Sequence, residues 1–106
     1  MKPRLTAAER LDRLVTESEL QHMIQDLLDL YKWKWHHTSD SRRSTAGLPD
    51  IVAIRPPRVL FAELKRETGR TSKTQEEWLE ALGRSPGVET YLWRPSDMDE
   101  IVRTLK

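Results

Sequence analysis

Apolar residues recur at helical spacing in the segment after Thr16, and this pattern predicts a helix over residues 17–31. Its apolar stripe consists of Leu20, Met23, Ile24, Leu27, Leu28 and Tyr31. Thr16 and Glu19 have the spacing of a capping box, in which the threonine hydroxyl and the glutamate carboxylate each bind the other residue's backbone N–H. Because the cap occupies Glu19, we expect Glu17, which lies on the side of the helix that faces the protein body, to be the glutamate available to a functional site.

Shorter apolar runs predict four strands and two further helices. The strands are expected at residues 33–38, 51–54, 59–64 and 88–94, and the helices at residues 73–84 and 97–105, with a weaker amphipathic helix over residues 5–15. Ser72 or Thr71 is the expected N-cap of the first of these helices, and Ser96 with Asp99 has capping spacing at the last. The order α, β, β, β, α, β, α favours one α/β domain, in which helices flank a central mixed four-stranded sheet.

The second and third predicted strands flank Arg55-Pro-Pro-Arg58, which predicts a β-hairpin. Prolines do not supply the positive φ of a tight two-residue turn, so we expect a loop of about four residues. A symmetric loop places Asp50 opposite Glu63, with Cβ atoms about 5 Å apart, where like charges repel unless a cation lies between them. Lys65 shares a strand face with Glu63 because it lies two residues further on. The three side chains together predict the site of a metal-dependent phosphodiesterase.

Basic residues are concentrated around this proposed site. Residues 34–73 hold nine Lys or Arg against four Asp or Glu, whereas residues 1–33 carry a net charge of −1 and residues 74–106 a net charge of −3. A phosphate backbone is attracted to such a block. Uneven charge also occurs on highly charged proteins that bind no nucleic acid. The basic block therefore indicates nucleic-acid binding only together with the acidic pair beside it.

The absence of cysteine narrows the chemistry. Without thiols, the chain has no disulfide, thiolate metal site or cysteine nucleophile, so a metal must be held by oxygen or imidazole ligands. No segment approaches the roughly 20 consecutive apolar residues of a membrane span, and the first residues lack the apolar region of a secretory signal. We therefore expect a cytoplasmic protein.

Pro49-Asp50 followed by Glu63-Leu64-Lys65 resembles the PD-(D/E)xK nuclease motif, and the chain is similar to the VRR-NUC family of that superfamily. The resemblance implies a restriction-endonuclease-like fold in a single domain, with a core over residues 16–105 and an N-terminal extension over residues 1–15. Further matching elements are Glu17 with Gln21, His37-Thr-Ser-Asp-Ser-Arg-Arg43, Gly47-Leu-Pro-Asp50, Gly69-Arg70, Ser72, Gln75, Trp78-Leu79 and Tyr91-Leu-Trp-Arg-Pro95.

Each candidate site residue has an expected role. Asp50 and Glu63 supply oxygen ligands suited to Mg²⁺ or Mn²⁺, and the resemblance adds the backbone carbonyl of Leu64. Lys65 would polarise the attacking water and offset the developing negative charge. The remaining candidates are Glu17 for a second metal or a bridging water, Gln75 for orienting water or phosphate, and His37, Arg42, Arg43 and Arg70 for contacting nucleic acid.

Some of these residues also suit ordinary structural positions. Glu17 suits a favourable charge at a helix N-terminus, and Gln75 suits a solvated helix surface. Only one of His36 and His37 can face the site, because adjacent strand residues point to opposite faces, and either suits an ordinary strand position. The four tryptophans are expected in the core, or one of them at a subunit interface or stacked on a base.

The resemblance to small stand-alone phage and bacterial members implies an endonuclease that cuts structured or branched DNA, like a Holliday junction resolvase, and acts as a homodimer. An exonuclease or an RNA-directed nuclease would use the same fold. A different class is a noncatalytic nucleic-acid-binding or assembly subunit that retains the fold. Such subunits typically lose an acid or the lysine, and this chain has all three residues.

Overall fold

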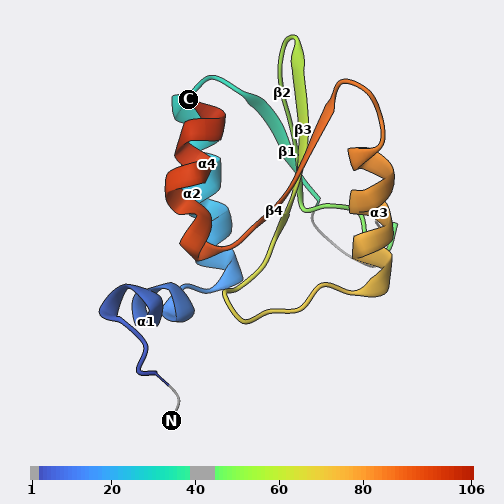
Figure 1. The fold of residues 1–106 in the computed structure, drawn as a ribbon. Helices are drawn as coiled ribbons and strands as arrows, with labels where there is room; N and C mark the ends of the chain where they lie inside the picture. Colours follow the sequence, from blue (N-terminus) through green and yellow to red (C-terminus); the bar gives the residue numbers. More distant parts are fainter. Residues whose placement is uncertain (1–2, 39–44) are drawn as a thin grey trace.

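Helices and strands follow one another in the order that the sequence predicts. The computed structural model describes residues 3–38 and 45–106. Within these residues the elements are α1 (Ala7–Leu14), α2 (Glu17–Leu30), β1 (Lys34–His37), β2 (Ile51–Arg55), β3 (Arg58–Leu64), α3 (Lys73–Gly83), β4 (Val88–Trp93), a 3-10 turn η1 (Pro95–Asp97) and α4 (Met98–Leu105). The strands form one sheet in the order β1-β2-β3-β4, in which only β3 and β4 run parallel (Figure 1). The predicted α/β class with a mixed four-stranded sheet is therefore confirmed.

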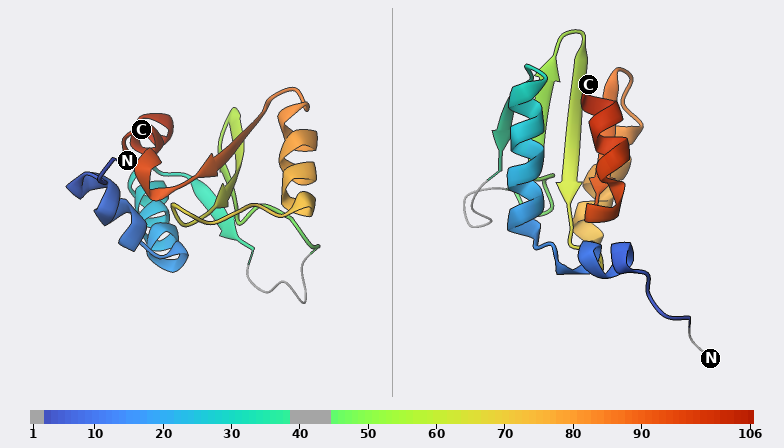
Figure 2. Two further views of the ribbon diagram at one scale, coloured as in Figure 1. Left: turned by 60° about the horizontal axis from the view of Figure 1, so that its bottom comes forward. Right: turned by 90° about the vertical axis from the view of Figure 1, so that its left-hand side faces the viewer.

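The sheet separates two helical layers of unequal size. Helices α2 and α4 lie side by side on one face, and α3 covers the other face beside β4 (Figures 1 and 2). The core lies on the α2 and α4 side, where alternate strand residues meet the apolar stripes of both helices. Its fully buried members include Leu20, Ile24, Leu28, Ile51, Ala53, Leu60, Ala62, Ile101 and Leu105. Because side chains alternate along a strand, the residues between these point to the α3 side.

Helix α1 lies outside these layers and contributes no buried residue. Thr6 caps it through a capping box with Glu9, but its apolar residues Leu11 and Leu14 are 64% and 71% exposed. The predicted amphipathic helix therefore forms without an apolar partner surface among the described residues. No helix in residues 3–38 and 45–106 is long and apolar enough to cross a membrane.

The hairpin turn is tighter than the sequence suggested. Pairing of β2 with β3 continues to Arg55 opposite Arg58, so Pro56 and Pro57 alone make the connection, and the peptide bond between them is cis. The expected loop of about four residues is therefore wrong, because the ladder extends through both arginines. Both arginines stack on the buried Trp33 ring, at 4.6 Å and 4.9 Å from its centroid.

The start of the last helix also differs from the prediction. Residues Pro95–Asp97 form a 3-10 turn, and the Asp97 carboxylate accepts a hydrogen bond from the Arg94 backbone N–H at 2.9 Å. Ser96 instead donates its hydroxyl and its backbone N–H to Glu67, a residue of the loop between β3 and α3. The capping spacing of Ser96 and Asp99 is therefore not used, because a long-range partner competes successfully for the serine.

Candidate functional site

Asp50 and Glu63 lie opposite each other at the open end of the β2–β3 hairpin. Ile51 pairs with Ala62 in the antiparallel register, so the next residue on each side, Asp50 and Glu63, continues that register. The Leu64 backbone N–H donates to Asp50 Oδ2 at 2.8 Å and fixes the orientation of this carboxylate. The juxtaposition expected from a symmetric hairpin is confirmed, because the turn is symmetric even though it is shorter than expected.

The Glu63 carboxyl is buried beside Asp50. Its side chain is 1% exposed, Oε1 accepts a hydrogen bond from Gln75 Nε2 at 3.3 Å, and Oε2 has no partner among the described residues. Burial, followed by the nearby Asp50 side chain and its charge, raises the pKa of Glu63 from 4.5 to about 9, against the opposing effect of Lys65. A carboxyl with this pKa holds a proton at neutral pH. A cation that replaces the proton would satisfy both carboxylates together.

Lys65 and Glu17 reach the same place from different elements. Lys65 directly follows β3, and its backbone N–H donates to the Trp93 carbonyl at 3.0 Å, which ties it to the end of β4. Glu17 is the first residue of α2. Desolvation and then the charge of Asp50 raise the pKa of Glu17, whereas Lys65 lowers it. The N-terminus of α2 therefore lies close enough for these charges to act on one another.

Glu19 forms the capping box that the sequence predicts at the start of α2. The Glu19 backbone N–H donates to Thr16 Oγ1, and the Thr16 N–H donates to Glu19 Oε1, both at 3.1 Å. These hydrogen bonds lower the pKa of Glu19. Glu19 is thus held in the capping box, and Glu17 is the residue whose charge acts on the site.

Gln75 joins helix capping and the acid pair through one amide group. Its Oε1 accepts from the Ser72 N–H at 2.8 Å, and its own backbone N–H donates to Ser72 Oγ at 3.1 Å. With the amide oxygen engaged in the cap, the amide NH₂ points at Glu63. Ser72 was one of the two expected N-caps, but the capping box with Gln75 was not predicted, although the two residues have the required spacing.

Gly47 is a positioning residue whose role the sequence analysis missed. Its φ is +85°, and a Cβ atom there would lie 2.6 Å from the backbone carbon of Thr74 at the start of α3. A side chain at this position would push the loop away from α3. The absence of a side chain therefore lets the segment that leads to Asp50 lie directly against the helix that carries Gln75. A glycine three residues before Asp50 could have predicted a tight turn or a close backbone contact at this position.

The nucleic-acid candidates are only partly brought to the site. His37 pairs with the core residue Ile51, so it points to the face under α2 and α4, and His36, which pairs with Val52, shares the face of the acid pair. Strand alternation therefore places His36, and not His37, on the face of the acid pair, and the contact of His37 with nucleic acid stays a prediction. Arg70 is exposed in the loop between β3 and α3. Arg42 and Arg43 lie outside the described residues.

The donor set fits one hard cation held by few protein ligands. In residues 3–38 and 45–106 no group of three or more His, Asp or Glu side chains is close enough to share an ion. The acid pair has a backbone group beside it, because the Leu64 N–H points to Asp50 and the carbonyl of a strand residue points to the same side as its N–H. Mg²⁺ suits such a set, since it keeps several waters. Glu17 does not form a group with Asp50 and Glu63 that could share one ion among the described residues.

The sheet, its flanking helices and the acid pair together indicate a class of protein. A mixed sheet flanked by helices, with an acid pair on its hairpin, is the restriction-endonuclease-like fold of nucleases. The sequence model of the VRR-NUC domain family matches residues 8–95, and the chain belongs to this family, whose members are generally nucleases. The match begins inside α1.

Two solved structures have the same fold. One, described as a VRR-NUC domain, is 18% identical and has a TM-score of 0.66, with 84% of this chain and 97% of that chain covered. The other, described as a VRR-NUC domain protein, is 21% identical and has a TM-score of 0.64, with 87% and 91% covered. No curated protein matches the chain.

The packing of Gly47 predicts that Gly47→Ala destabilises the protein by roughly 1–3 kcal/mol, because it combines an unfavourable φ with a clash against backbone. Gly87→Ala is the matched control, since Gly87 has a φ of +78° but nothing within 4 Å of its added Cβ. Urea denaturation of both variants measures the difference. Equal losses would show that the loop before Asp50 does not depend on its contact with Thr74.

The raised pKa of Glu63 predicts a pH-dependent stability in the absence of metal. The folded protein binds a proton between the ordinary pKa of 4.5 and the folded value of about 9 that the unfolded chain does not. The stabilising contribution of the protonated carboxyl is complete below pH 4.5 and is lost as pH rises through that window, by at most about 1.4 kcal/mol per pH unit.

Glu63→Gln isolates this effect, because the amide stays neutral while every other group still titrates. We expect the free energy of unfolding of Glu63→Gln, minus that of the wild type, to increase steadily from acidic to alkaline pH in urea titrations with EDTA. A difference that stays constant with pH would mean that Glu63 is ionised at neutral pH and that its burial is offset by other means.

Proposed function

We propose that this chain is a metal-dependent nuclease that hydrolyses phosphodiester bonds in DNA. The observation that carries the proposal is the buried Glu63 carboxyl, with one oxygen unpartnered among the described residues, facing Asp50 and flanked by Lys65. Two carboxylates that face each other repel unless a proton or a cation lies between them, and a cation there is what phosphodiester hydrolysis uses. Membership of a family whose members are generally nucleases supports the same chemistry.

Asp50, Glu63 and the Leu64 carbonyl would hold Mg²⁺ or Mn²⁺. When bound, the ion would neutralise charge on the phosphate and make its bound water more acidic. Asp50 is prepared for this role by the Leu64 N–H, which orients its carboxylate. Glu63 must release its proton to become a ligand, and the Gln75 amide then stabilises the resulting carboxylate by donating to Oε1. These residues determine where the phosphate sits.

Lys65 and Glu17 complete the proposed chemistry around this acid pair. The Lys65 ammonium lies close enough to oppose the raised pKa values of both Glu63 and Glu17. Placed beside the scissile phosphate, it would orient the attacking water and stabilise the negative charge that develops in the transition state. Glu17 would hold a second ion or a bridging water from the start of α2, since it is exposed and belongs to no three-carboxylate cluster within residues 3–38 and 45–106.

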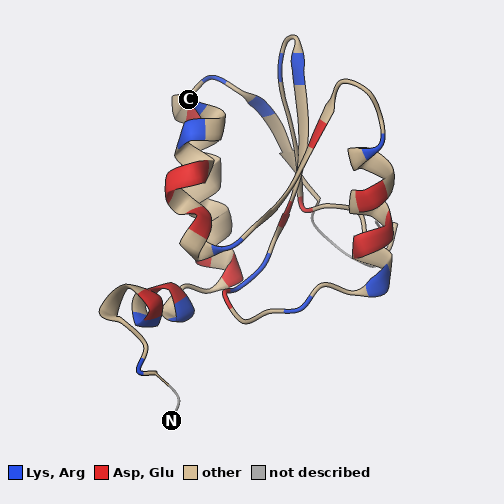
Figure 3. Cartoon of the chain, in the orientation of Figure 1, with Lys and Arg blue, Asp and Glu red and all other residues tan. Residues whose placement is uncertain are grey.

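A DNA substrate is supported by the charge around the site. Basic residues follow one another along the β3–α3 segment at the lower edge of the sheet (Figure 3). A two-fold homodimer would present two such sites to two strands, as the symmetric cutting of branched DNA requires. We therefore propose structured or branched DNA as the substrate and a homodimer as the active form.

Asp50→Asn tests the proposed nuclease activity. The asparagine can still accept the Leu64 hydrogen bond, so we expect the fold to persist while cleavage falls at least about 100-fold through loss of the metal ligand. The assay is cleavage of labelled linear duplex, single strand, flap, four-way junction and RNA with Mg²⁺, Mn²⁺ or EDTA. Asp26→Asn, an exposed change of the same type on α2, is the control.

Preferred cutting of the junction would identify branched DNA as the substrate, and preferred cutting of RNA or of ends would assign one of the other nuclease activities. Binding without cutting in every metal would instead make the chain a noncatalytic subunit and refute the proposed function.

A matched pair on α2 separates catalysis from capping. Glu17→Ala should lower the cleavage rate at least about tenfold with little change in stability, because it removes a charge that acts on the site. Glu19→Ala should lower stability with little change in rate, because it removes half of the capping box. Cleavage kinetics measure the rate of each variant, and thermal unfolding measures its stability. The reverse pattern would exclude Glu17 from the site.

A further inference from the structure

The loop between β3 and α3, residues 66–72, is held in shape by the end of β4. Arg94 follows β4 directly, and its Nη1 donates to the carbonyl oxygens of Arg66, Glu67 and Gly69 at 2.7, 3.3 and 2.7 Å. The Gly69 N–H also donates to the Arg66 carbonyl at 3.0 Å, which closes a turn. Three carbonyls therefore converge on one guanidinium nitrogen, and the chain curls around it.

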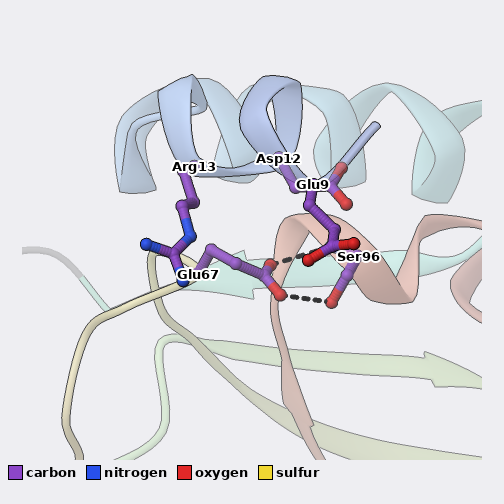
Figure 4. A pocket seen from close by; sticks show the side chains of 5 residues that line it. All are labelled: Glu9, Asp12, Arg13, Glu67 and Ser96. Atoms are coloured by element: carbon purple, nitrogen blue, oxygen red, sulfur yellow. Dashed lines mark hydrogen bonds between the residues drawn. The ribbon is translucent and has the colours of Figure 1, made fainter. Parts of the chain in front are cut away.

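A second anchor holds the same loop by its only acidic side chain. The Glu67 carboxylate accepts from both the backbone N–H and the hydroxyl of Ser96 in η1. This contact lies in a small hollow that is also lined by Glu9, Asp12 and Arg13 of α1 (Figure 4). The one negative charge of the loop is thus engaged by η1 on the side where α1 packs.

The positive charges of the segment are left at the surface. Arg66, Arg70 and Lys73 are exposed, and residues 65–73 contain no acid other than Glu67. Another cation, Arg94, lies beneath the loop and increases the positive charge there instead of offsetting it. The segment starts at Lys65 and ends at the helix that carries Gln75, so both of its ends lie next to residues of the proposed site. Such a run of exposed positive charges attracts a polyanion to this side of the proposed site.

We propose that the β3–α3 loop is a preformed phosphate-binding track for the nucleic acid strand that passes the site, with Arg66 and Arg70 as the contacts and Arg94 as the positioning residue that holds them. This inference rests on the proposed function for the identity of the strand, but the track needs no catalysis to bind. Arg94 acts on the loop backbone and does not itself touch the strand. A rigid track lets the strand bind without first ordering the loop.

The salt dependence of binding tests the two contact arginines. The double variant Arg66→Ala/Arg70→Ala should bind a short fluorescent DNA duplex more weakly, and its plot of log affinity against log salt should be shallower by about 0.9 per lost phosphate contact. Arg84→Ala/Arg103→Ala removes the same charge from exposed positions on the end of α3 and on α4 and is the matched control. Fluorescence anisotropy in EDTA measures both. Equal slopes for the two doubles would refute the track.

Because cleavage does not occur in EDTA, this assay separates the two proposals. A shallower slope for Arg66→Ala/Arg70→Ala in a protein that never cuts DNA would support the track and refute the proposed nuclease. Normal cutting together with identical slopes for both double variants would support the nuclease and refute the track.

Trypsin sensitivity tests Arg94 directly, because trypsin cuts after Arg66 and Arg70 once the loop loosens. Arg94→Met should speed cutting there at least about tenfold and should raise KM for DNA while kcat at saturation changes less than about twofold. All three hydrogen bonds come from one nitrogen, so Arg94→Lys, with three donors on its ammonium, should partly restore both properties.

Unchanged trypsin cutting, or a fall in kcat without a rise in KM, would overturn the positioning role. If Arg94→Met does not fold, Ser96→Ala tests the second anchor. Its loss of the hydroxyl contact to Glu67 should speed cutting after Arg66, and unchanged cutting would again contradict the role of η1 in holding the loop.

Discussion

The register of the β2–β3 hairpin is the constraint on which the rest of the site depends. Side chains alternate along a strand, so a slip of one residue would turn every side chain of one strand to the other face of the sheet. The register is determined at the turn, where Arg55 and Arg58 pair across Pro56-Pro57 and both stack on Trp33. At the other end of the same two strands, this register brings Asp50 opposite Glu63.

This register places the negative charge of Asp50 beside Glu63, and the main electrostatic effect is a raised pKa of Glu63. Its carboxyl is buried beside Asp50, and its pKa is raised to about 9, so Glu63 keeps its proton at neutral pH in the metal-free protein. In the proposed function, a divalent cation would take the place of the proton, so its binding would be coupled to proton release and its affinity would increase with pH.

Helix α3 and strand β4 then position the residues that surround the acid pair. The N-terminus of α3 accepts the Gly47 loop against Thr74 and turns the Gln75 amide toward Glu63. The end of β4 holds Lys65 by its backbone and the following loop through Arg94. The packing of Gly47 against Thr74 and the hydrogen bonds of Lys65 and Arg94 act on backbone groups, whereas the Gln75 amide contacts the Glu63 side chain. The proposed site is therefore held both by segments that are distant in sequence and by hydrogen bonds between its own residues.

Features that depend on neighbouring residues could be predicted from the sequence alone. Thr16 and Glu19 make the expected capping box, the order of helices and strands is as predicted, and the symmetric hairpin places Asp50 opposite Glu63. Capping, side-chain periodicity and strand alternation are local rules, so the residues that carry them are sufficient to apply them. The resemblance to the VRR-NUC family rested on the same ordered residues.

Features that depend on distant partners were decided only by the tertiary structure. Ser96 has the spacing of a cap but binds Glu67, and the face on which each strand histidine lies followed from pairing of β1 with β2. Neither the burial of Glu63 nor the three carbonyls around Arg94 leaves a local pattern in the chain. The sequence by itself determined which groups are present and which of them share a strand face or a helix cap. Only the packed fold decided which were desolvated and which were held by backbone from elsewhere, because both effects arise from segments that meet only in the folded protein.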